Sequence, residues 1–229
     1  QAEAQVKGYQ IIEHQQAIEK TVHEQLKIMG VKRIGFEKAH MTYKLYETYQ
    51  KELTATLIPV DQLVEQIRLY KTEEEIKILK EAAEIADKAY EHIQKYIKPG
   101  VKEIDIANEL EFYMRRLGAT SSSFDTIVAS GERSALPHGV ASEKEIQSGE
   151  LVTLDYGAIY KGYCSDITRT VAIGEISPQL QTIYETVQAA QELAVQKIGP
   201  HMTGKEADAI ARDYIDHKGY GAYFGHSTG

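Results

Sequence analysis

The chain of 229 residues is 42% hydrophobic and 26% charged, with a formal net charge of −8. Its composition is that of an ordinary globular protein, and its length suffices for one large domain or for a small and a medium one. The negative charge, without a run of lysine or arginine, argues against generic nucleic-acid binding, and the lack of a long apolar run argues against a membrane protein. The single cysteine, Cys164, excludes an internal disulfide and indicates a reducing, cytoplasmic location; we expect it to be a small buried strand residue.

Residues 1–70 alternate helical and strand patterns, which predicts a small α/β domain. The predicted elements are helices over 11–29, 40–50 and 61–69 and strands over 33–36 and 54–59. Two strands are too few for an independent sheet, so we expect this domain to be partial. The chain also starts without Met, in a polar stretch, and stops abruptly at His226-Ser-Thr-Gly229, so we expect both ends to be incomplete. His14, His23 and His40 show no metal-ligand spacing.

The second part of the chain carries longer amphipathic helices with clear start and stop signals. A capping box at Thr72-Glu-Glu-Glu75 starts a helix that runs to Lys98 and that Pro99-Gly100 ends. A second helix, over 103–117, is followed by Gly118, which suits the left-handed position after a helix. Further elements are expected as a strand over 124–129, a loop to residue 150, two strands within 151–173, and helices over 178–198 and 204–218.

The two helix pairs repeat at a constant offset of 101 residues, as from Pro99 to Pro200 and from Gly118 to Gly219. Coincident proline and glycine stops without a gap are stronger evidence of duplication than matching apolar positions. We therefore expect residues 72–171 to form the first half of a duplicated α+β unit. The second half ends before its equivalent strands, so any ligands that those strands carry lie outside the sequence.

Two strands within residues 151–173 carry one aspartate each, Asp155 and Asp166. In a hairpin that turns at residues 160–162, these aspartates fall at paired positions with both carboxylates on one face. Ionised carboxylates so close together repel, and burying them is costly unless a proton or a cation lies between them. Oxygen ligands on rigid strands suit Mn²⁺, Mg²⁺ or Zn²⁺, which favours a metal clamp. The alternative is a pair of surface aspartates flanking an ordinary hairpin.

Several motifs together resemble one family, the creatinase-type or "pita-bread" metallopeptidases, which include methionine aminopeptidase, aminopeptidase P and prolidase. The motifs are Ala135-Leu-Pro-His138-Gly139, Leu154-Asp155-Tyr-Gly157, Gly162-Tyr-Cys-Ser-Asp166-Ile-Thr-Arg169-Thr and Gly225-His226-Ser-Thr-Gly229. The resemblance covers residues 72–229 and is specific because both aspartate motifs follow the Pro-His-Gly motif in order. It implies an α+β pita-bread fold with pseudo-twofold duplicated halves.

The resemblance implies a site of two Asp, one His and two Glu that bind two divalent metal ions, with Mn²⁺ first and Co²⁺ or Zn²⁺ as alternatives. Asp155 matches the aspartate that chelates one ion, and Asp166 matches the aspartate that bridges both. His226 matches a histidine that contacts the substrate or the intermediate, and His138 matches one that lines the substrate side. The histidine ligand would directly follow Gly229, with both glutamates beyond it, so we expect this chain alone to be inactive.

An N-terminal α/β domain before the pita-bread domain is similar to prolidase and aminopeptidase P. The chain is then a partial creatinase-type domain over 1–70 and a pita-bread domain over 71–229 that lacks its C-terminal part. The resemblance implies metal-assisted hydrolysis of the bond between an N-terminal residue and proline, in peptides or dipeptides, with His226 and His138 stabilising the intermediate and the peptide carbonyl. The expected partner is a peptide with proline in second position, and a homodimer is expected by analogy alone.

Two other functions stay open at this point. The same fold serves as a non-catalytic binding module when its metal ligands are lost, although both aspartates and both histidines are present here. A creatinase-like amidinohydrolase keeps the fold and needs no metal. The residue preferred before proline and the metal used in the cell are not indicated by the sequence.

Overall fold

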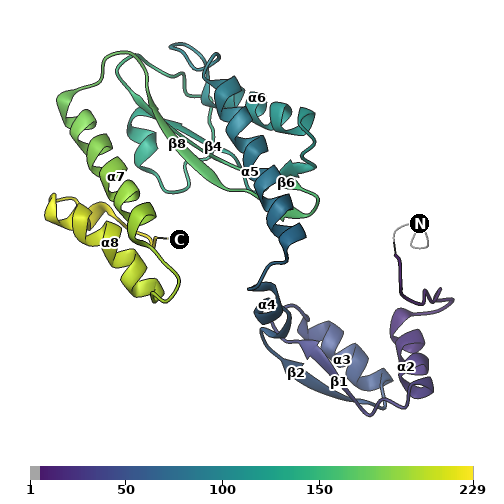
Figure 1. Ribbon diagram of the computed structural model, residues 1–229. Helices are drawn as coiled ribbons and strands as arrows, with labels where there is room; N and C mark the ends of the chain where they lie inside the picture. Colours follow the sequence, from purple (N-terminus) through teal and green to yellow (C-terminus); the bar gives the residue numbers. More distant parts are fainter. Residues whose placement is uncertain (1–5, 229) are drawn as a thin grey trace. The chain divides into compact units, whose positions relative to one another are not determined.

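The computed structural model describes residues 6–228 (Figure 1). Along the chain it divides into two compact units, Gln1–Thr72 and Glu73–Gly229. Each unit has its own strands and its own helices. Within residues 6–228, no helix combines the length and the apolar character that a membrane span requires.

Within residues 6–72, the first unit consists of a two-stranded parallel sheet and three helices. Its elements are α2 (Ile18–Ile28), β1 (Arg33–Glu37), α3 (Tyr43–Glu52), β2 (Thr56–Val60) and α4 (Leu63–Arg68). Ile34 lies opposite Leu57 in the sheet, and the Thr42 side chain caps α3 by accepting from the Leu45 amide at 3.3 Å. The predicted alternation of helices and strands is confirmed.

The first predicted helix, over residues 11–29, is wrong at its N-terminal end. α2 begins only at Ile18, and the preceding Ala17 is extended, with a ψ of 136°. Ile11 and Ile12 are 40% and 42% exposed. Because these apolar side chains stay largely in solvent, no packing stabilises a helical turn there.

The second unit consists of antiparallel strands and two pairs of helices. Its elements are α5 (Glu73–Ile93), α6 (Glu103–Arg116), β3 (Ser121–Ser122), β4 (Ile127–Ser130), the 3₁₀ turn η1 (Gly131–Ala135), β5 (Leu151–Tyr156), β6 (Ala158–Tyr160), β7 (Tyr163–Cys164), β8 (Ile167–Ala172), α7 (Pro178–Lys197), α8 (Gly204–His217) and the 3₁₀ turn η2 (Gly221–Tyr223). One sheet has the order β4-β5-β8 and the other β3-β6-β7. The strand predicted over 124–129 is present as β4, shifted toward the C-terminus.

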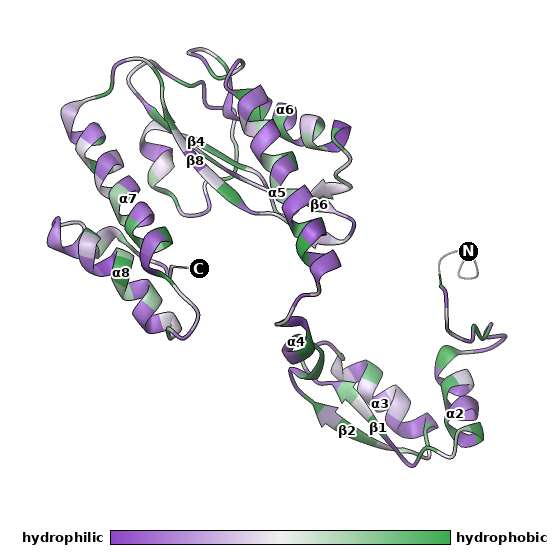
Figure 2. Cartoon of the chain, viewed as in Figure 1, coloured by the Kyte–Doolittle hydropathy of each residue, from purple (hydrophilic) through white to green (hydrophobic). Residues whose placement is uncertain are grey.

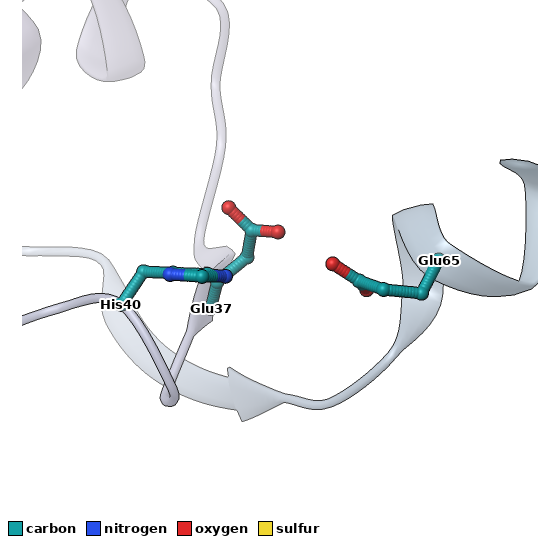
Figure 3. A group of neighbouring side chains, drawn as sticks. All are labelled: Glu37, His40 and Glu65. Carbon is teal, nitrogen blue, oxygen red and sulfur yellow. The ribbon is translucent and has the colours of Figure 1, made fainter. Parts of the chain in front are cut away.

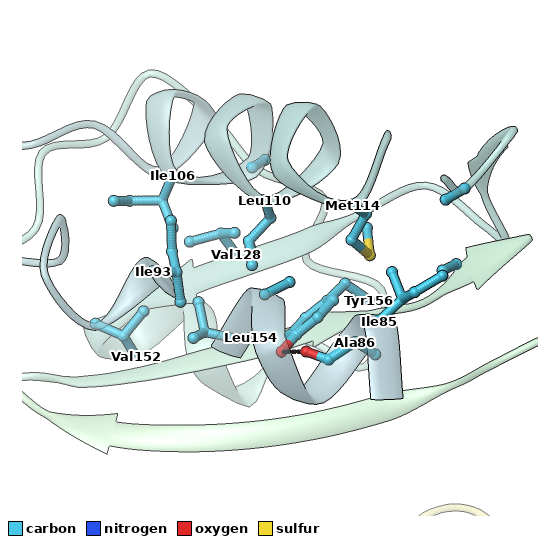
Figure 4. Packing of buried hydrophobic residues seen from close by; sticks show 14 of the residues in the cluster. Ile85, Ala86, Ile93, Ile106, Leu110, Met114, Val128, Val152, Leu154 and Tyr156 are labelled. Atoms are coloured by element: carbon cyan, nitrogen blue, oxygen red, sulfur yellow. Dashed lines mark hydrogen bonds between the residues drawn. The ribbon is translucent and has the colours of Figure 1, made fainter. Parts of the chain in front are cut away.

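α5 and α6 bury their apolar faces against the β4-β5-β8 sheet (Figure 4). Ile93 on α5, Leu110 on α6 and Leu154 on β5 are all fully buried, and each such side chain contributes about 1.5–3 kcal/mol relative to exposure. The Tyr156 phenol donates to the Ala86 carbonyl oxygen at 3.1 Å, which ties β5 to α5. Hydrophilic residues cover much of α5 and α6 in the view of Figure 2, as amphipathic helices require. β5 is therefore held in place both by packing and by this hydrogen bond.

The repeated helix pair has the predicted spacing. α6 and α8 each contain 14 residues, and both of their ends are offset by 101 positions. Gly118 and Gly219, which follow them, have φ values of +106° and +85°, in the left-handed region that favours glycine. α5, however, ends at Ile93 rather than at Lys98, because the Tyr96 amide bonds back to the Ile93 carbonyl over three residues, at 2.8 Å.

The predicted aspartate hairpin is divided into four short strands, and its register is not the expected one. Asp155 lies opposite Thr168 rather than Asp166, which precedes β8 and is therefore a diagonal neighbour of Asp155. Two backbone segments come very close where β5 passes into β6, since a Cβ at Gly157 would overlap the Ser165 carbonyl oxygen. Diagonal neighbours lie on the same face of a sheet, so the predicted sharing of one face holds although the pairing was wrong.

Candidate metal and substrate site

Asp155 lies at the boundary between the core and solvent. It is half-buried on β5, and its Oδ1 atom is buried without a hydrogen-bond partner among residues 6–228. Burial raises the pKa of the Asp155 carboxyl, and the nearby Asp166 carboxylate raises this pKa further. A hydrogen bond from Thr168 and the charge of His138 act in the opposite direction but do not reverse the shift.

An unpartnered buried oxygen beside a second carboxylate is unfavourable unless a positive group lies next to it. Among the described residues, no ion pair joins a lysine or arginine to Asp155 or Asp166. Carboxylate oxygens are the ligands that hard divalent cations prefer. The donor set at these two residues therefore fits a divalent metal ion.

Asp166 is exposed in the short segment between β7 and β8. This position leaves its carboxylate open to a ligand or a metal ion from the solvent side. Cys164, two residues earlier, was expected to be buried and is instead exposed. β7 is a two-residue strand at the edge of its sheet, so one of its side-chain faces is left uncovered.

His138 lies at the exposed tip of the loop that follows η1. Val140, two residues further on, forms a bridge to Ile127, and Ile127 lies opposite Asp155. The loop thus brings His138 toward the aspartate pair, and the charge of His138 lowers the pKa of the Asp155 carboxyl slightly. The loop turns tightly at this point, because the Val140 amide donates to the His138 carbonyl at 2.9 Å and the Gly139 amide donates to the Leu136 carbonyl at 3.2 Å.

His226 is exposed in the segment after η2, and α8 holds this segment through a charged pair. The Arg212 guanidinium binds both carboxylate oxygens of Asp208, at 2.6 and 3.1 Å, and donates to the carbonyl oxygens of Phe224 and His226 at 2.9 and 2.7 Å. The Thr228 amide donates to Asp208 Oδ1 at 2.7 Å. Hydrogen bonds from Arg212 and Thr228 hold the pKa of the Asp208 carboxyl well below its usual range.

The structure thus brings together three of the four predicted site residues. Asp155, Asp166 and His138 interact electrostatically, whereas no hydrogen bond or ion pair among the described residues links His226 to them. His226 instead borders an apolar cavity of about 540 Å³ that Ala190, Ala194 and other residues of α7 and α8 line. Gly229, which completes the last motif, lies outside the described residues.

Comparison with known families decides the assignment of this chain. Residues 77–229 match metallopeptidase family M24, and residues 1–70 match the creatinase/prolidase N-terminal domain. The chain belongs to metallopeptidase family M24. Membership implies divalent metal ions, in agreement with the donor set at Asp155 and Asp166.

Relatives of this M24 protein include dipeptidases. The chain is 61% identical to an uncharacterized peptidase of Bacillus subtilis over 230 residues, which is 100% of this chain and 65% of the relative. It is 45% identical to the Xaa-Pro dipeptidase of Pyrococcus horikoshii over 201 residues, which is 87% of this chain and 57% of the relative. The chain therefore spans less than two thirds of the length of these relatives.

Solved structures of similar proteins have the same fold. An Xaa-Pro dipeptidase from Bacillus anthracis has a TM-score of 0.97 and 58% sequence identity, covering 99% of this chain and 64% of that one. A prolidase from Pyrococcus furiosus has a TM-score of 0.86 and 40% identity, covering 94% of this chain and 63% of that one. The predicted family and the predicted pita-bread fold after a creatinase-type N-terminal domain are confirmed.

The N-terminal unit of this M24 protein contains a second group of donor atoms. Glu37, His40 and Glu65 offer ligand atoms that lie within 4.8 Å of one another (Figure 3). All three residues are exposed, and carboxylates on a surface commonly gather without an ion. We assign no metal to this group. His40 showed no ligand spacing in the sequence, and only the fold brings it close to the two glutamates.

Two polar pairs of the M24 unit were missed by the sequence analysis. Asp208 and Arg212 are spaced at i and i+4 on a helix, a signal that the sequence offers but that is typical of any surface ion pair. Glu103 and Arg133 are 30 residues apart and carry no signal at all, since only the fold joins them.

Proposed function

We propose that the complete protein is a peptidase that hydrolyses the bond before proline at the N-terminus of peptides or dipeptides, with two divalent metal ions, Mn²⁺ foremost. The observation that carries this proposal is the buried, unpartnered Oδ1 of Asp155 beside the Asp166 carboxylate. The Xaa-Pro preference is supported by the relatives named as Xaa-Pro dipeptidases, at 45% and 58% identity.

In this proposal, Asp155 and Asp166 hold the metal ions. Divalent ions held there would lower the pKa of a bound water molecule and polarise the scissile carbonyl. His138 and His226 are exposed. Nδ1 of His226 bonds to the Ser227 carbonyl oxygen at 2.8 Å, which leaves its Nε2, like the His138 ring, open to donate a hydrogen bond to the peptide carbonyl oxygen or to the oxyanion that develops from it.

Two carboxylates hold a pair of ions weakly, so the proposal requires further ligands from residues outside this sequence. It follows that residues 1–229 alone are inactive. We assign residues 1–70 to an accessory N-terminal domain and residues 71–229 to the catalytic domain, which is supported by the family matches over 1–70 and 77–229. The unpaired, exposed Cys164 supports a reducing, cytoplasmic location, and a homodimer is proposed by analogy only.

The test is hydrolysis by the complete protein, loaded with Mn²⁺. We expect cleavage of Ala-Pro and of a longer Ala-Pro peptide, little cleavage of Ala-Ala, and loss of activity after chelation that added Mn²⁺ restores. Metal-independent hydrolysis of a creatine-type substrate would instead support an amidinohydrolase. Absence of hydrolysis of every substrate, together with absence of metal binding, would support a binding module and sink the proposal.

A further inference from the structure

Glu103 is a fully buried carboxylate that the proposed reaction does not use. It is the first residue of α6, and its side chain is 0% exposed. Burial of a carboxylate without partners is strongly unfavourable, so the fold must satisfy its oxygens. The partners of Glu103 all come from the segments on either side of the His138 loop, which we define as residues 134–141.

Five hydrogen bonds reach the Glu103 carboxylate. Oε1 accepts from the Ser130 amide at 2.7 Å and from the Ser130 hydroxyl at 2.9 Å. Oε2 accepts from Arg133 Nε at 3.0 Å, from the Ser142 hydroxyl at 2.6 Å and from the Ser142 amide at 3.2 Å. Ser130 and Ser142 flank the His138 loop, so a single carboxylate joins both of its ends.

Arg133 extends this connection into the loop itself. While its Nε donates to Glu103, its second terminal nitrogen donates to the Val140 carbonyl oxygen at 2.7 Å. Val140 is two residues from His138, and the Val140 amide donates to the His138 carbonyl. The guanidinium therefore spans the loop from the buried carboxylate to the residues beside the imidazole.

The loop is also placed against the strand next to Asp155. Val140 forms an antiparallel bridge to Ile127 on β4, and Ile127 lies opposite Asp155 on β5. Strands in a sheet lie about 4.7–4.9 Å apart, so Val140 is two strand spacings from Asp155. Holding Val140 against β4 therefore limits how far His138, two residues earlier, can move from the aspartate pair.

We propose that Glu103 and Arg133 are positioning residues that hold the His138 loop, and with it His138, beside Asp155. This inference rests on the proposed function, in which His138 contacts the substrate. The five hydrogen bonds act together on an ion pair that is shielded from solvent on the Glu103 side. Burial raises the pKa of Glu103, but the hydrogen bonds from Ser142, Ser130 and Arg133 outweigh burial and lower this pKa overall. The Glu103 carboxylate is therefore ionised at neutral pH.

The test uses Arg133→Ala and Arg133→Lys in the complete, Mn²⁺-loaded protein. Alanine removes both bonds, whereas the single lysine nitrogen reaches Glu103 or the Val140 carbonyl but not both. The four serine bonds to Glu103 remain in both variants, so the fold is expected to be retained. The matched control is Lys102→Ala, which breaks an exposed pair to Glu143 at 2.7 Å, one residue away from Glu103 and from Ser142.

Two quantities are measured: amide hydrogen exchange and the kinetics of Ala-Pro hydrolysis. In Arg133→Ala we expect exchange over residues 134–142 to accelerate about tenfold and exchange in α5 to stay unchanged. We expect kcat to fall about 10- to 100-fold with KM within about threefold, because a displaced His138 fails in the transition state rather than in binding. In Arg133→Lys, the exchange rate and kcat should both lie between those of the wild type and of Arg133→Ala. In Lys102→Ala, both quantities should match the wild type within about twofold.

Unchanged exchange over residues 134–142 in Arg133→Ala would show that the pair does not hold the loop and would overturn the inference. Faster exchange with an unchanged kcat would also overturn it, because the loop would then be held without consequence for the reaction. If the wild type itself cleaves no Xaa-Pro substrate, the proposed function fails, while the exchange measurement still decides whether Glu103 and Arg133 hold the loop.

Discussion

At the scale of single residues, Glu103 and Asp155 are two carboxylates with opposite environments. Glu103 is fully buried, and five hydrogen bonds satisfy its two oxygens. Asp155 is only half-buried, yet one of its oxygens is enclosed without a partner and a second carboxylate lies nearby. The first arrangement stabilises the fold, and the second leaves a carboxylate oxygen free to bind a cation.

The Glu103→Gln variant is expected to lower the free energy of unfolding by about 2 kcal/mol at neutral pH, since its amide nitrogen would face the donors that a carboxylate oxygen accepts. The pKa of Glu103 is raised by burial but lowered more by its hydrogen bonds, so the folded value lies below the ordinary 4.5. The carboxylate's contribution is therefore complete above pH 4.5 and is lost as the pH falls below it. Urea unfolding of the wild type and of Glu103→Gln at pH 7 and at pH 4 measures this loss. A difference in the free energy of unfolding between the two proteins that does not shrink at pH 4 would contradict the prediction.

At the scale of elements, the passage from β5 to β6 sets the relation between the two aspartates. The Ser165 amide donates to the Ala158 carbonyl at 2.9 Å, and the Ser165 hydroxyl accepts from the Ala158 amide at 3.0 Å. The Ser123 hydroxyl donates to the Ser165 carbonyl at 2.8 Å. These contacts need a residue without a side chain at position 157, because the backbones approach too closely for a Cβ.

Gly157→Ala is expected to lower the free energy of unfolding by about 1–3 kcal/mol, because its Cβ overlaps the Ser165 carbonyl and the backbone must shift. The shift moves Asp166 relative to Asp155, so metal affinity should fall as well. The matched control is Gly204→Ala at the start of α8, where a Cβ meets nothing within 4 Å and stability should not decrease. Both variants are measured by thermal unfolding and by Mn²⁺ titration. Equal stability and equal Mn²⁺ affinity of the two variants would refute the role of Gly157.

The helices could be predicted from the sequence because their signals are local. The Thr203–Glu206 capping box is present at α8, and Pro178 starts α7 as expected. The register of the aspartate strands could not be predicted, because it depends on contacts between residues far apart in the sequence, such as the hydrogen bond of Ser123 to Ser165 across 42 positions. Glu103 was missed for a related reason: a glutamate in the first turn of a helix is normally an exposed residue. Only residues distant in sequence, Ser130 at the end of β4 together with Arg133 and Ser142, satisfy it as a buried carboxylate.

At the scale of the whole molecule, all four proposed site residues belong to the second unit, Glu73–Gly229. The first unit matches the creatinase/prolidase N-terminal domain and supplies none of them. The chain spans less than two thirds of the length of its relatives. We propose that residues outside 1–229 supply further metal ligands, because two carboxylates hold a pair of ions weakly. We propose that Asp155 and Asp166 are metal ligands in the complete protein.

The most direct test of this claim is calorimetric titration of the complete, metal-free protein with Mn²⁺. We predict that the wild type binds about two ions per chain, as paired-metal hydrolases do. Asp155→Asn should lose at least one of these ions, while the control Asp105→Asn, which changes an exposed carboxylate on α6, should bind as the wild type does. Mn²⁺ binding by Asp155→Asn with wild-type affinity and stoichiometry, or no binding by the wild type, would contradict the account.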